Sequence, residues 1–324
     1  MRPYAEYLQY VNSLIQQSPF KGTPGNLYEP LNYILALGGK RMRPVLTLMG
    51  CELFGGNMED AAQQALAIEV FHNFTLMHDD IMDNAPIRRG QPAVHVKWNE
   101  PTAILSGDLM MIKSMDLIRN AAPDKQKPLL DIFNKTACEV CEGQQMDMDF
   151  EVENKVNEEL YIEMIRLKTA VLLGCSLQAG AIVAGATADA QKAIYSFGEQ
   201  MGVGFQLMDD ILDVYGQSDK VGKQVGGDII SNKKTYLLIK ALELAEGENC
   251  ELLHYWLNED DFAPEEKVKA VTAVYNNLGV KEIAAAKSEA YFTLAYRLLD
   301  TIDIPAENKQ YLHEFCEMIR TRIH

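Results

Sequence analysis

Apolar residues recur at three- and four-residue steps through most of the chain. Residues 61–77 and 284–299 show this spacing clearly, and it is the spacing of one face of an α-helix. Ala, Leu, Met, Glu, Gln and Lys are abundant, and all of them favour helix. We find no convincing series of the alternating segments that mark β-strands. The pattern therefore predicts an all-α fold.

Segments with Pro, Gly or Asn divide this pattern into helices of about 10 to 25 residues. None of them looks like a long flexible linker, so we expect a single domain covering residues 1–324. The breaks fall at residues 19–24, 54–57, 84–101, 121–128, 216–227 and 258–264.

The longest weakly charged stretch covers residues 169–188 and is long enough to span a bilayer. Ser176, Gln178 and Thr187 interrupt it, and small residues dominate it. We therefore expect a buried core helix and no membrane span.

The N-terminus lacks an apolar run fit for a signal peptide, and six cysteines, most of them within helical patterns, fit a reducing cytoplasm. Cys138 and Cys141 have the spacing of a redox pair, but they lack the βαβ context of such a motif.

Two segments place acidic residues among apolar neighbours. FTLMHDDIMD (74–83) and FQLMDDILD (205–213) each carry the pattern Asp-Asp-x-x-Asp between Leu, Ile, Met and Phe. On a helix, the first and last aspartates of each pattern lie one turn apart on one face, with the middle aspartate at the flank. The predicted triads are Asp79, Asp80 and Asp83, and Asp209, Asp210 and Asp213.

Such clusters in an apolar wall repel each other and lose solvation, and a hard divalent cation removes both problems. Ligand sets made only of oxygen favour Mg²⁺, Mn²⁺ or Ca²⁺ over zinc. Mg²⁺ takes one or two carboxylates and fills its other positions with water and phosphate oxygens. The two triads therefore predict a phosphate-bearing ligand held between them by magnesium.

Basic residues gather near the acidic segments although the net charge is −16. This charge argues against a nucleic-acid partner and makes each local basic cluster informative. Guanidinium groups bind phosphate bidentately, and lysine acts as a point charge. The cations therefore predict sites for two anionic groups, one bound through metal and one bound directly. They are Lys40, Arg41, Arg43, Arg88, Arg89, Lys168, Lys223, Lys233 and Lys234.

Taken in order, these motifs resemble those of trans-isoprenyl diphosphate synthases, the polyprenyl synthetase family. The resemblance rests on GGKRMRP (38–44), HDDIMDNAPIRRG (78–90), GQQMD (143–147), KTA (168–170), FQLMDDILD and GKQVGGDIISNKKTY (222–236). It covers residues from about 30 to 240, and residues 245–324 carry little motif signal. It implies an all-α bundle around a deep central cavity, usually in a homodimer, that condenses isopentenyl diphosphate with an allylic diphosphate.

The resemblance also implies roles for single residues. The cofactor is Mg²⁺, with about three ions per site, each taking few carboxylates. Its ligands are Asp79, Asp83 and Asp209, with Asp80, Asp210 and Asp213 beside them. The allylic diphosphate contacts Arg88, Lys168, Lys223 and Lys233, and the isopentenyl diphosphate contacts Lys40, Arg43, His72 and Arg89. Thr169 and Gln206 lie near the developing carbocation. We find no obvious general base among the side chains. The resemblance implies that the departing diphosphate takes the proton.

Three features admit more than one interpretation. His72 precedes Asp79 by two helical turns on the same face, and it is either a diphosphate contact or a core histidine. Residues 216–227 form either a closing lid or an ordinary surface loop. Phe74 and Phe71 lie about 7.5 and 12 Å from Asp79 along a helix, and they either close the hydrocarbon cavity or pack in the core.

The length of the product follows from the same aromatic positions. In the family, an aromatic residue five positions before the first aspartate accompanies short products. Phe74 occupies that position, whereas Thr75 is not aromatic, and no two-residue insertion separates the aspartates. The combination resembles archaeal geranylgeranyl diphosphate synthases, so we expect a C20 product. The alternatives are a C15 farnesyl product, a class I terpene cyclase, and a non-catalytic subunit of a heteromeric synthase.

Overall fold

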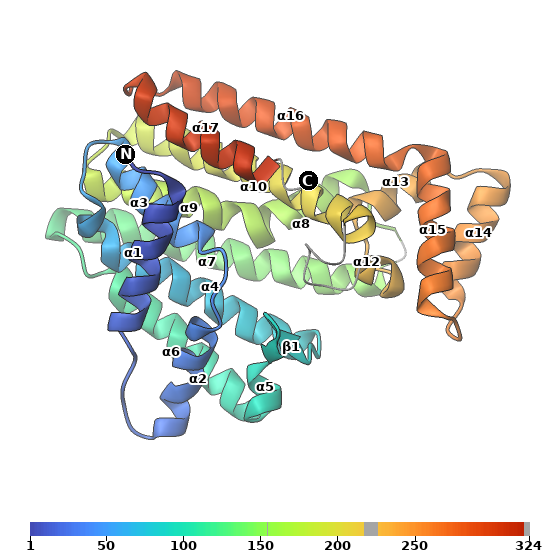
Figure 1. The fold of residues 1–324 in the computed structure, drawn as a ribbon, viewed down its shortest axis with the longest axis horizontal. Coiled ribbons are helices and arrows are strands. Elements are labelled where there is room, and N and C mark those ends of the chain that lie inside the picture. Colours follow the sequence, from blue (N-terminus) through green and yellow to red (C-terminus); the bar gives the residue numbers. More distant parts are fainter. Residues whose placement is uncertain (154, 217–225, 321–324) are drawn as a thin grey trace. The chain divides into compact units, whose positions relative to one another are not determined.

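The computed structural model describes residues 1–153, 155–216 and 226–320, and these residues are almost entirely helical (Figure 1). Their only strands are β1 (Ile87–Arg88) and β2 (Gln91–Pro92), which form a short antiparallel hairpin. The predicted all-α fold is confirmed. The chain divides into two compact units, and the prediction of a single domain stays a prediction.

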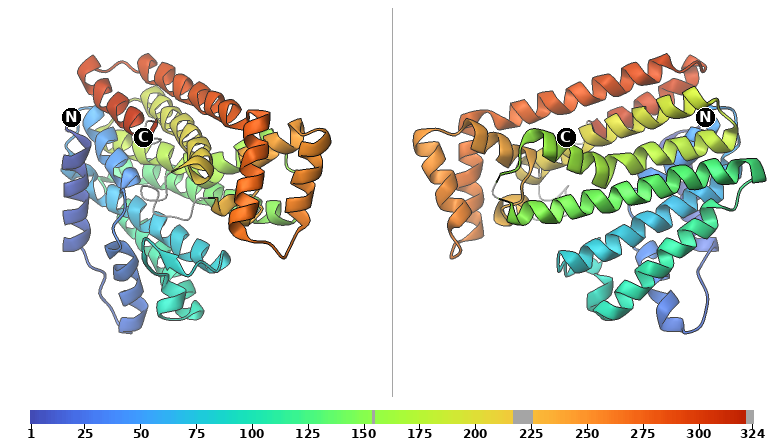
Figure 2. Two further views of the ribbon diagram at one scale, coloured as in Figure 1. Left: turned by 45° about the vertical axis from the view of Figure 1, so that its right-hand side comes forward. Right: turned by 180° about the vertical axis from the view of Figure 1, so that it is seen from behind.

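Unit 1 contains Met1–Thr136, Leu173–Tyr195 and Leu299–Phe315. The helices wholly within it are α1 (Tyr4–Gln17), α2 (Gly25–Ala36), α3 (Met42–Leu53), the 3₁₀ helix η1 (Met58–Ala61), α4 (Ala62–Met82), α5 (Val94–Lys97) and α6 (Glu100–Ile118). Helices α4 and α6 run side by side (Figure 2). Leu66, Val70 and Met77 of α4 share a core cluster with residues of α2 and α6, which fixes the face of α4 that carries the first triad.

Unit 2 contains Ala137–Leu172, Ser196–Leu298 and Cys316–His324. The helices wholly within it are α8 (Glu158–Ile165), the π-helix η2 (Arg166–Ala170), α12 (Gly227–Ile230), α13 (Tyr236–Leu244), α14 (Gly247–Asn258) and α15 (Pro264–Leu278). Boundaries between the units fall within α7 (Pro123–Val152), α9 (Val171–Ala184), α10 (Ala188–Tyr215), α16 (Val280–Thr301) and α17 (Ala306–Arg320).

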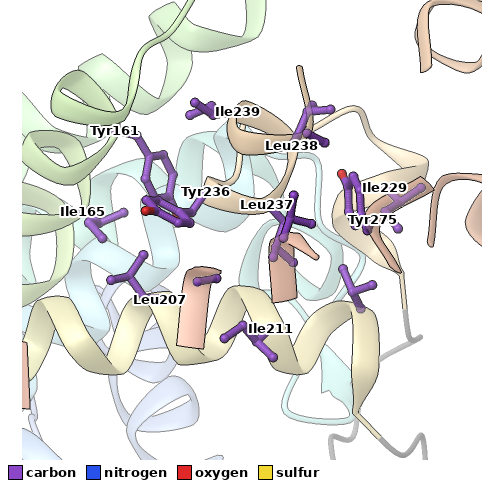
Figure 3. Packing of buried hydrophobic residues seen from close by; sticks show 14 of the residues in the cluster. Tyr161, Ile165, Leu207, Ile211, Ile229, Tyr236, Leu237, Leu238, Ile239 and Tyr275 are labelled. Atoms are coloured by element: carbon purple, nitrogen blue, oxygen red, sulfur yellow. The ribbon is translucent and has the colours of Figure 1, made fainter. Parts of the chain in front are cut away.

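The core of unit 2 surrounds the helix that carries the second triad. Leu207 and Ile211 of α10 belong to one buried cluster with Tyr161 of α8, Tyr236 of α13 and Tyr275 of α15 (Figure 3). These apolar neighbours hold one face of α10 in the core. The aspartates at the end of α10 are therefore presented by a helix whose orientation within the unit is fixed.

The apolar stretch near residue 170 is confirmed as a core segment. The apolar helix Glu158–Ala184 is long enough to cross a membrane, but 72% of its most apolar window is buried within the protein. Its small residues have a packing role, because a Cβ at Gly180 would lie 2.1 Å from the Thr47 carbonyl oxygen of α3. All six cysteines lie in the described part of the chain and form no disulfide there, and Cys138 and Cys141 are exposed on α7.

Candidate active site

In the first triad, the middle aspartate has a different environment from the outer two. Asp80 is only 1% exposed. Arg88 Nε donates to its two carboxylate oxygens at 2.9 and 3.1 Å, and Arg88 Nη2 also donates to Oδ1. Asp79 is half-buried and Asp83 is exposed. Burial raises the pKa of the Asp80 carboxyl, and the ion pair with Arg88 opposes that shift.

The hairpin after α4 brings Arg88 back to the triad. Strand β1 ends at Arg88, and the next residues, Arg89 and Gly90, have φ values of 52° and 75°. This left-handed turn reverses the chain. Arg88 Nη2 then lies 3.7 Å from Asp79 Oδ2 as well as beside Asp80. The predicted allylic-diphosphate contact therefore lies directly at the predicted metal ligands.

Three of the residues predicted to bind isopentenyl diphosphate come together in unit 1. Arg43 Nη1 of α3 lies 3.2 Å from His72 Nε2 of α4, and Arg89 donates to the Gly38 carbonyl. A Cβ at Gly39 would lie 2.8 Å from Arg89 Cζ, so the glycine lets the guanidinium lie against the backbone. The fourth residue, Lys40, follows Gly39 in the chain.

His72 is a neutral imidazole in a cationic setting. Its pKa is held well below the ordinary value by burial first and then by the nearby arginines, Arg43 foremost. An uncharged ring adds no further positive charge to this cluster, and it offers a ring nitrogen for hydrogen bonding. The structure thus gives His72 polar neighbours that a core histidine at this position would not require.

Sequence reasoning missed a buried ion pair beneath this cluster. Arg41, which precedes α3 with a φ of 49°, pairs with Glu69 of α4. Asn73 Nδ2 donates to the carbonyl and the carboxylate of Glu69, both at 2.8 Å. The one signal in the sequence is a glutamate within the helical segment 61–77, and nothing local indicates its partner.

The second triad repeats the division seen in the first. Asp210 is buried, and its Oδ2 accepts from the Tyr161 hydroxyl and from the Tyr236 amide at 3.2 Å. Burial raises the pKa of Asp210 to about 7. Asp209 and Asp213 are partly exposed, and Asp213 Oδ2 accepts from the Asp228 amide at 3.0 Å. Neither Tyr161 nor Tyr236 was predicted to take part.

Two predicted lysine contacts share one acidic partner. Lys168 Nζ lies 2.6 Å and Lys233 Nζ 3.7 Å from Asp147 Oδ2. Burial alone would raise the pKa of Asp147, but the charges of Lys233 and Lys168 hold it below its ordinary value. Asp147 ends the GQQMD motif, so this contact explains why an acid stands there. Lys223 and most of the segment 216–227 lie outside the described residues.

The π-helix η2 carries Lys168 and Thr169. Thr169 Oγ1 donates to Gln206 Oε1 of α10 at 3.3 Å, so the two residues predicted near the carbocation are in contact. A Cβ at Gly143 of α7 would lie 2.3 Å from the Lys168 backbone nitrogen. The backbones of α7 and η2 therefore touch at Gly143, which brings Lys168 within reach of Asp147, one helical turn further along α7.

The aromatic residues before the first triad contact one another. The Phe71 ring is buried, 5.6 Å from the Phe74 ring and 5.2 Å from the Phe133 ring. Phe74 is half-buried and packs edge-on against His78 at 4.8 Å. Thr75 donates to the His72 carbonyl at 2.8 Å. Phe71 therefore supports Phe74 from the core, and Phe74 is the more accessible ring.

The donors of both triads suit magnesium. Within each, the two accessible residues offer only carboxylate oxygens one turn apart, and Mg²⁺ needs no more than one or two carboxylates. In the parts of the chain that the structure describes, no group of three or more His, Cys, Asp or Glu side chains could hold a metal alone.

Comparison with known proteins decides the family. The model of the family described as polyprenyl synthetase matches residues 24–278. The chain belongs to the polyprenyl synthetase family. This polyprenyl synthetase is 37% identical to a short chain isoprenyl diphosphate synthase of Methanothermobacter thermautotrophicus, over 98% of this chain and 97% of the relative.

Two further relatives of this polyprenyl synthetase have more specific names. A geranylgeranyl pyrophosphate synthase of Geoglobus acetivorans is 36% identical over 97% of this chain and 96% of its own. A crystal structure of a geranylgeranyl pyrophosphate synthase superposes with a TM-score of 0.96 at 41% identity, covering all of both chains. The prediction that this polyprenyl synthetase is a prenyltransferase is confirmed.

Proposed function

We propose that this polyprenyl synthetase condenses isopentenyl diphosphate with allylic diphosphates and releases mainly geranylgeranyl diphosphate. The proposal rests on one arrangement that occurs twice. In each triad a buried middle aspartate is bonded within its unit, and two partly or fully exposed aspartates remain beside it. The names of the relatives favour the C20 product over the C15 alternative.

In this proposal the outer aspartates hold magnesium and the middle aspartates fix them. The direct ligands are Asp79, Asp83, Asp209 and Asp213. The other two predicted residues, Asp80 and Asp210, support these ligands through their own buried hydrogen bonds. Bound magnesium neutralises the departing diphosphate and so favours cleavage of the allylic C–O bond. The protein itself orients the four outer carboxylates, because Arg88 and Tyr161 lock the residue next to them.

The two diphosphates take different cations. Isopentenyl diphosphate binds Lys40, Arg43, His72 and Arg89. The Arg43 guanidinium contacts the neutral His72 imidazole, and the charge of Arg89 also acts on that ring. The allylic diphosphate binds Arg88, Lys168, Lys233 and Lys223. Asp147 supports this second set because it holds the ammonium groups of Lys168 and Lys233 near each other.

Thr169 and Gln206 stabilise the allylic carbocation. The Thr169 hydroxyl donates a hydrogen bond to Gln206 Oε1. The lone pairs of the Thr169 oxygen are therefore left to face the positive charge of the carbocation. Fixed dipoles of this kind stabilise a cation without attacking it. After the C=C bond of isopentenyl diphosphate attacks, the proton leaves to the departing diphosphate.

Phe74 sets the length of the product. Phe71 supports its ring from the core, and Thr75 is the next residue along the helix. The half-buried ring lies on the helix that carries Asp79, and the buried Phe71 keeps it from moving aside. A Phe74→Ala variant should shift the product toward longer chains, as measured by mass spectrometry. An unchanged product distribution would remove Phe74 from this role.

We also propose that the protein is a cytoplasmic homodimer. Helix α6 exposes Ile104, Leu105 and Ile112 at 40, 60 and 57% of their surfaces. Exposed apolar side chains gathered on one helix favour association. A second copy would cover them, and sedimentation equilibrium measures the resulting mass.

The mass of the product tests the proposed function. The purified protein is incubated with isopentenyl diphosphate, Mg²⁺ and a C5, C10 or C15 allylic starter. A C20 product from all three starters is the expected result. A product ending at C15 would mean that the side chains that close the hydrocarbon cavity lie closer to the aspartates. Hydrocarbon release without isopentenyl diphosphate would favour a terpene cyclase, and no reaction by the folded protein would favour a non-catalytic subunit.

A further inference from the structure

The segment from Gly226 to Thr235 links the second triad to a predicted diphosphate contact. The Gly226 and Asp228 amides donate to the Asp213 carbonyl and carboxylate at 2.7 and 3.0 Å. Helix α12 has a single turn, which is too short to be stable without tertiary contacts. The position of Lys233, which follows α12 in this segment, therefore depends on the tertiary contacts that stabilise α12.

Helices α14 and α15 form an adjacent pair (Figure 2), and a buried lysine of this pair contacts α12. Lys267 of α15 is 1% exposed, and its Nζ donates to the Ile230 carbonyl at the end of α12 at 3.4 Å. The ammonium lies 4.1 Å from the centre of the Phe262 ring. Burial lowers the pKa of Lys267, and only Asp260, beyond ion-pair distance, opposes that shift in the described part of the chain.

A lysine buried without a carboxylate partner is rare, because the loss of hydration is not offset by an ion pair. The last carbonyls of a helix lack partners within the helix, and a lysine can supply one. Lys267 does this for α12. The position of the cation thus explains how α12 ends.

A small cavity with a mostly apolar lining and a few polar groups lies beside this contact. Lys267, Asn232 and Trp256 all line it, and its free volume of about 10 Å³ admits one water-sized sphere. Trp256 Nε1 and Asn232 Oδ1 are buried and, within residues 1–153, 155–216 and 226–320, have no hydrogen-bond partner. One is a donor and the other an acceptor, so one water molecule can satisfy both.

Asn232 occupies a position on which the direction of the chain depends. Its φ is 55°, a left-handed conformation that asparagine tolerates better than most residues. Its Nδ2 donates to the Leu257 carbonyl at the end of α14 at 3.1 Å. The turn that leads directly into Lys233 is therefore fixed by the α14–α15 pair.

We propose that Lys267, Trp256 and Asn232, joined by one bound water molecule, form an anchor that positions Lys233 for magnesium diphosphate. The three are positioning residues and do not touch the substrate. This role gives a function to part of the chain beyond residue 245. It rests on the proposed function, since Lys233 is a diphosphate contact only if that function holds.

The test compares Lys267→Met with Lys269→Met, a control at an exposed position on the same helix. We expect Lys267→Met to raise the KM for the allylic diphosphate and the Mg²⁺ concentration for half-maximal rate by about tenfold. The KM for isopentenyl diphosphate should stay unchanged, because its predicted site lies in unit 1. Lys269→Met should change neither value.

A Trp256→Phe variant removes only the indole donor, and it tests the anchor if Lys267→Met does not fold. We expect faster amide hydrogen exchange in residues 227–235 of Trp256→Phe and no change in Lys269→Met. This readout needs no activity, so it separates failure of the anchor from failure of the proposed function. Equal changes in both KM values, or unchanged exchange in residues 227–235, would overturn the proposal.

Discussion

The two aspartate triads have nearly the same sequence but opposite electrostatic support. In unit 1, the middle carboxylate of Asp80 is paired with the Arg88 guanidinium. In unit 2, the equivalent carboxylate of Asp210 accepts hydrogen bonds from a hydroxyl and a backbone amide among the described residues, and burial raises its pKa to about 7. The middle carboxylate of the motif is therefore stabilised by a charged guanidinium in unit 1 and by neutral hydrogen-bond donors in unit 2.

The surroundings differ in the same way. Arginines surround a neutral His72 in unit 1, whereas lysines meet at Asp147 in unit 2. Arginine presents a rigid planar fork, and lysine presents a mobile point charge. This difference suits a unit 1 site that binds one diphosphate directly, and a unit 2 site whose diphosphate is shared with metal. Substitutions in each unit test the comparison.

The largest effect is expected from Arg88→Leu. It leaves the Asp80 carboxylate buried without its cation, and removing one partner of a buried pair costs about 3 kcal/mol of unfolding free energy. Urea denaturation measures this loss. Arg119→Leu, at an arginine that is 66% exposed, is the control and should change little. Equal stability of Arg88→Leu and the parent would show that Asp80 does not need the cation.

Gly143→Ala tests the placement of Lys168 in unit 2. The added Cβ would meet the Lys168 backbone nitrogen at 2.3 Å, and relieving that overlap should cost about 2 kcal/mol. The KM for the allylic diphosphate should rise as well. Gly25→Ala is the matched control, since its Cβ would meet only the Glu29 carboxylate at 3.4 Å. A fully stable and active Gly143→Ala enzyme would refute close contact between α7 and η2.

Tyr161→Phe should cost less than Arg88→Leu. It removes one hydrogen bond to Asp210 and leaves the Tyr236 amide in place, a loss of about 1 kcal/mol. Thermal unfolding at fixed pH measures it, with the exposed Tyr255→Phe as control. A loss as large as that of Arg88→Leu would mean that the two triads depend on their partners equally.

The smallest effect concerns pH. A histidine whose pKa is lowered on folding stays neutral in the folded state, so stability is lost as pH falls below the ordinary value of about 6.5. Arg43→Gln removes the main charge that lowers the pKa of His72, and it should reduce this acid-induced loss. Denaturation at pH 8 and pH 5.5 gives the difference. An identical pH dependence in both proteins would remove Arg43 as a cause.

The all-α fold could be predicted from the sequence because helical periodicity is a local signal. Repeated acids in apolar surroundings are also a local signal, and the metal and diphosphate roles assigned to the triads and the cations stay predictions. The sequence did not predict Tyr161 as the partner of Asp210, since the two are far apart in sequence and a tyrosine is unremarkable in an apolar helix. Glu69 and Lys267 were missed for a related reason. Each is one polar residue on a buried helical face, and only packing reveals its partner.

We propose that both triads act on the same metal-bound diphosphate. A double-mutant cycle tests it directly, with the affinity for a non-reactive allylic diphosphate analogue measured by calorimetry in Mg²⁺ for Asp79→Asn, Asp209→Asn and the double variant. Sites that share a ligand are non-additive. The double variant should therefore bind little more weakly than either single variant. Losses that simply add would contradict the claim and assign the two triads to separate ligands.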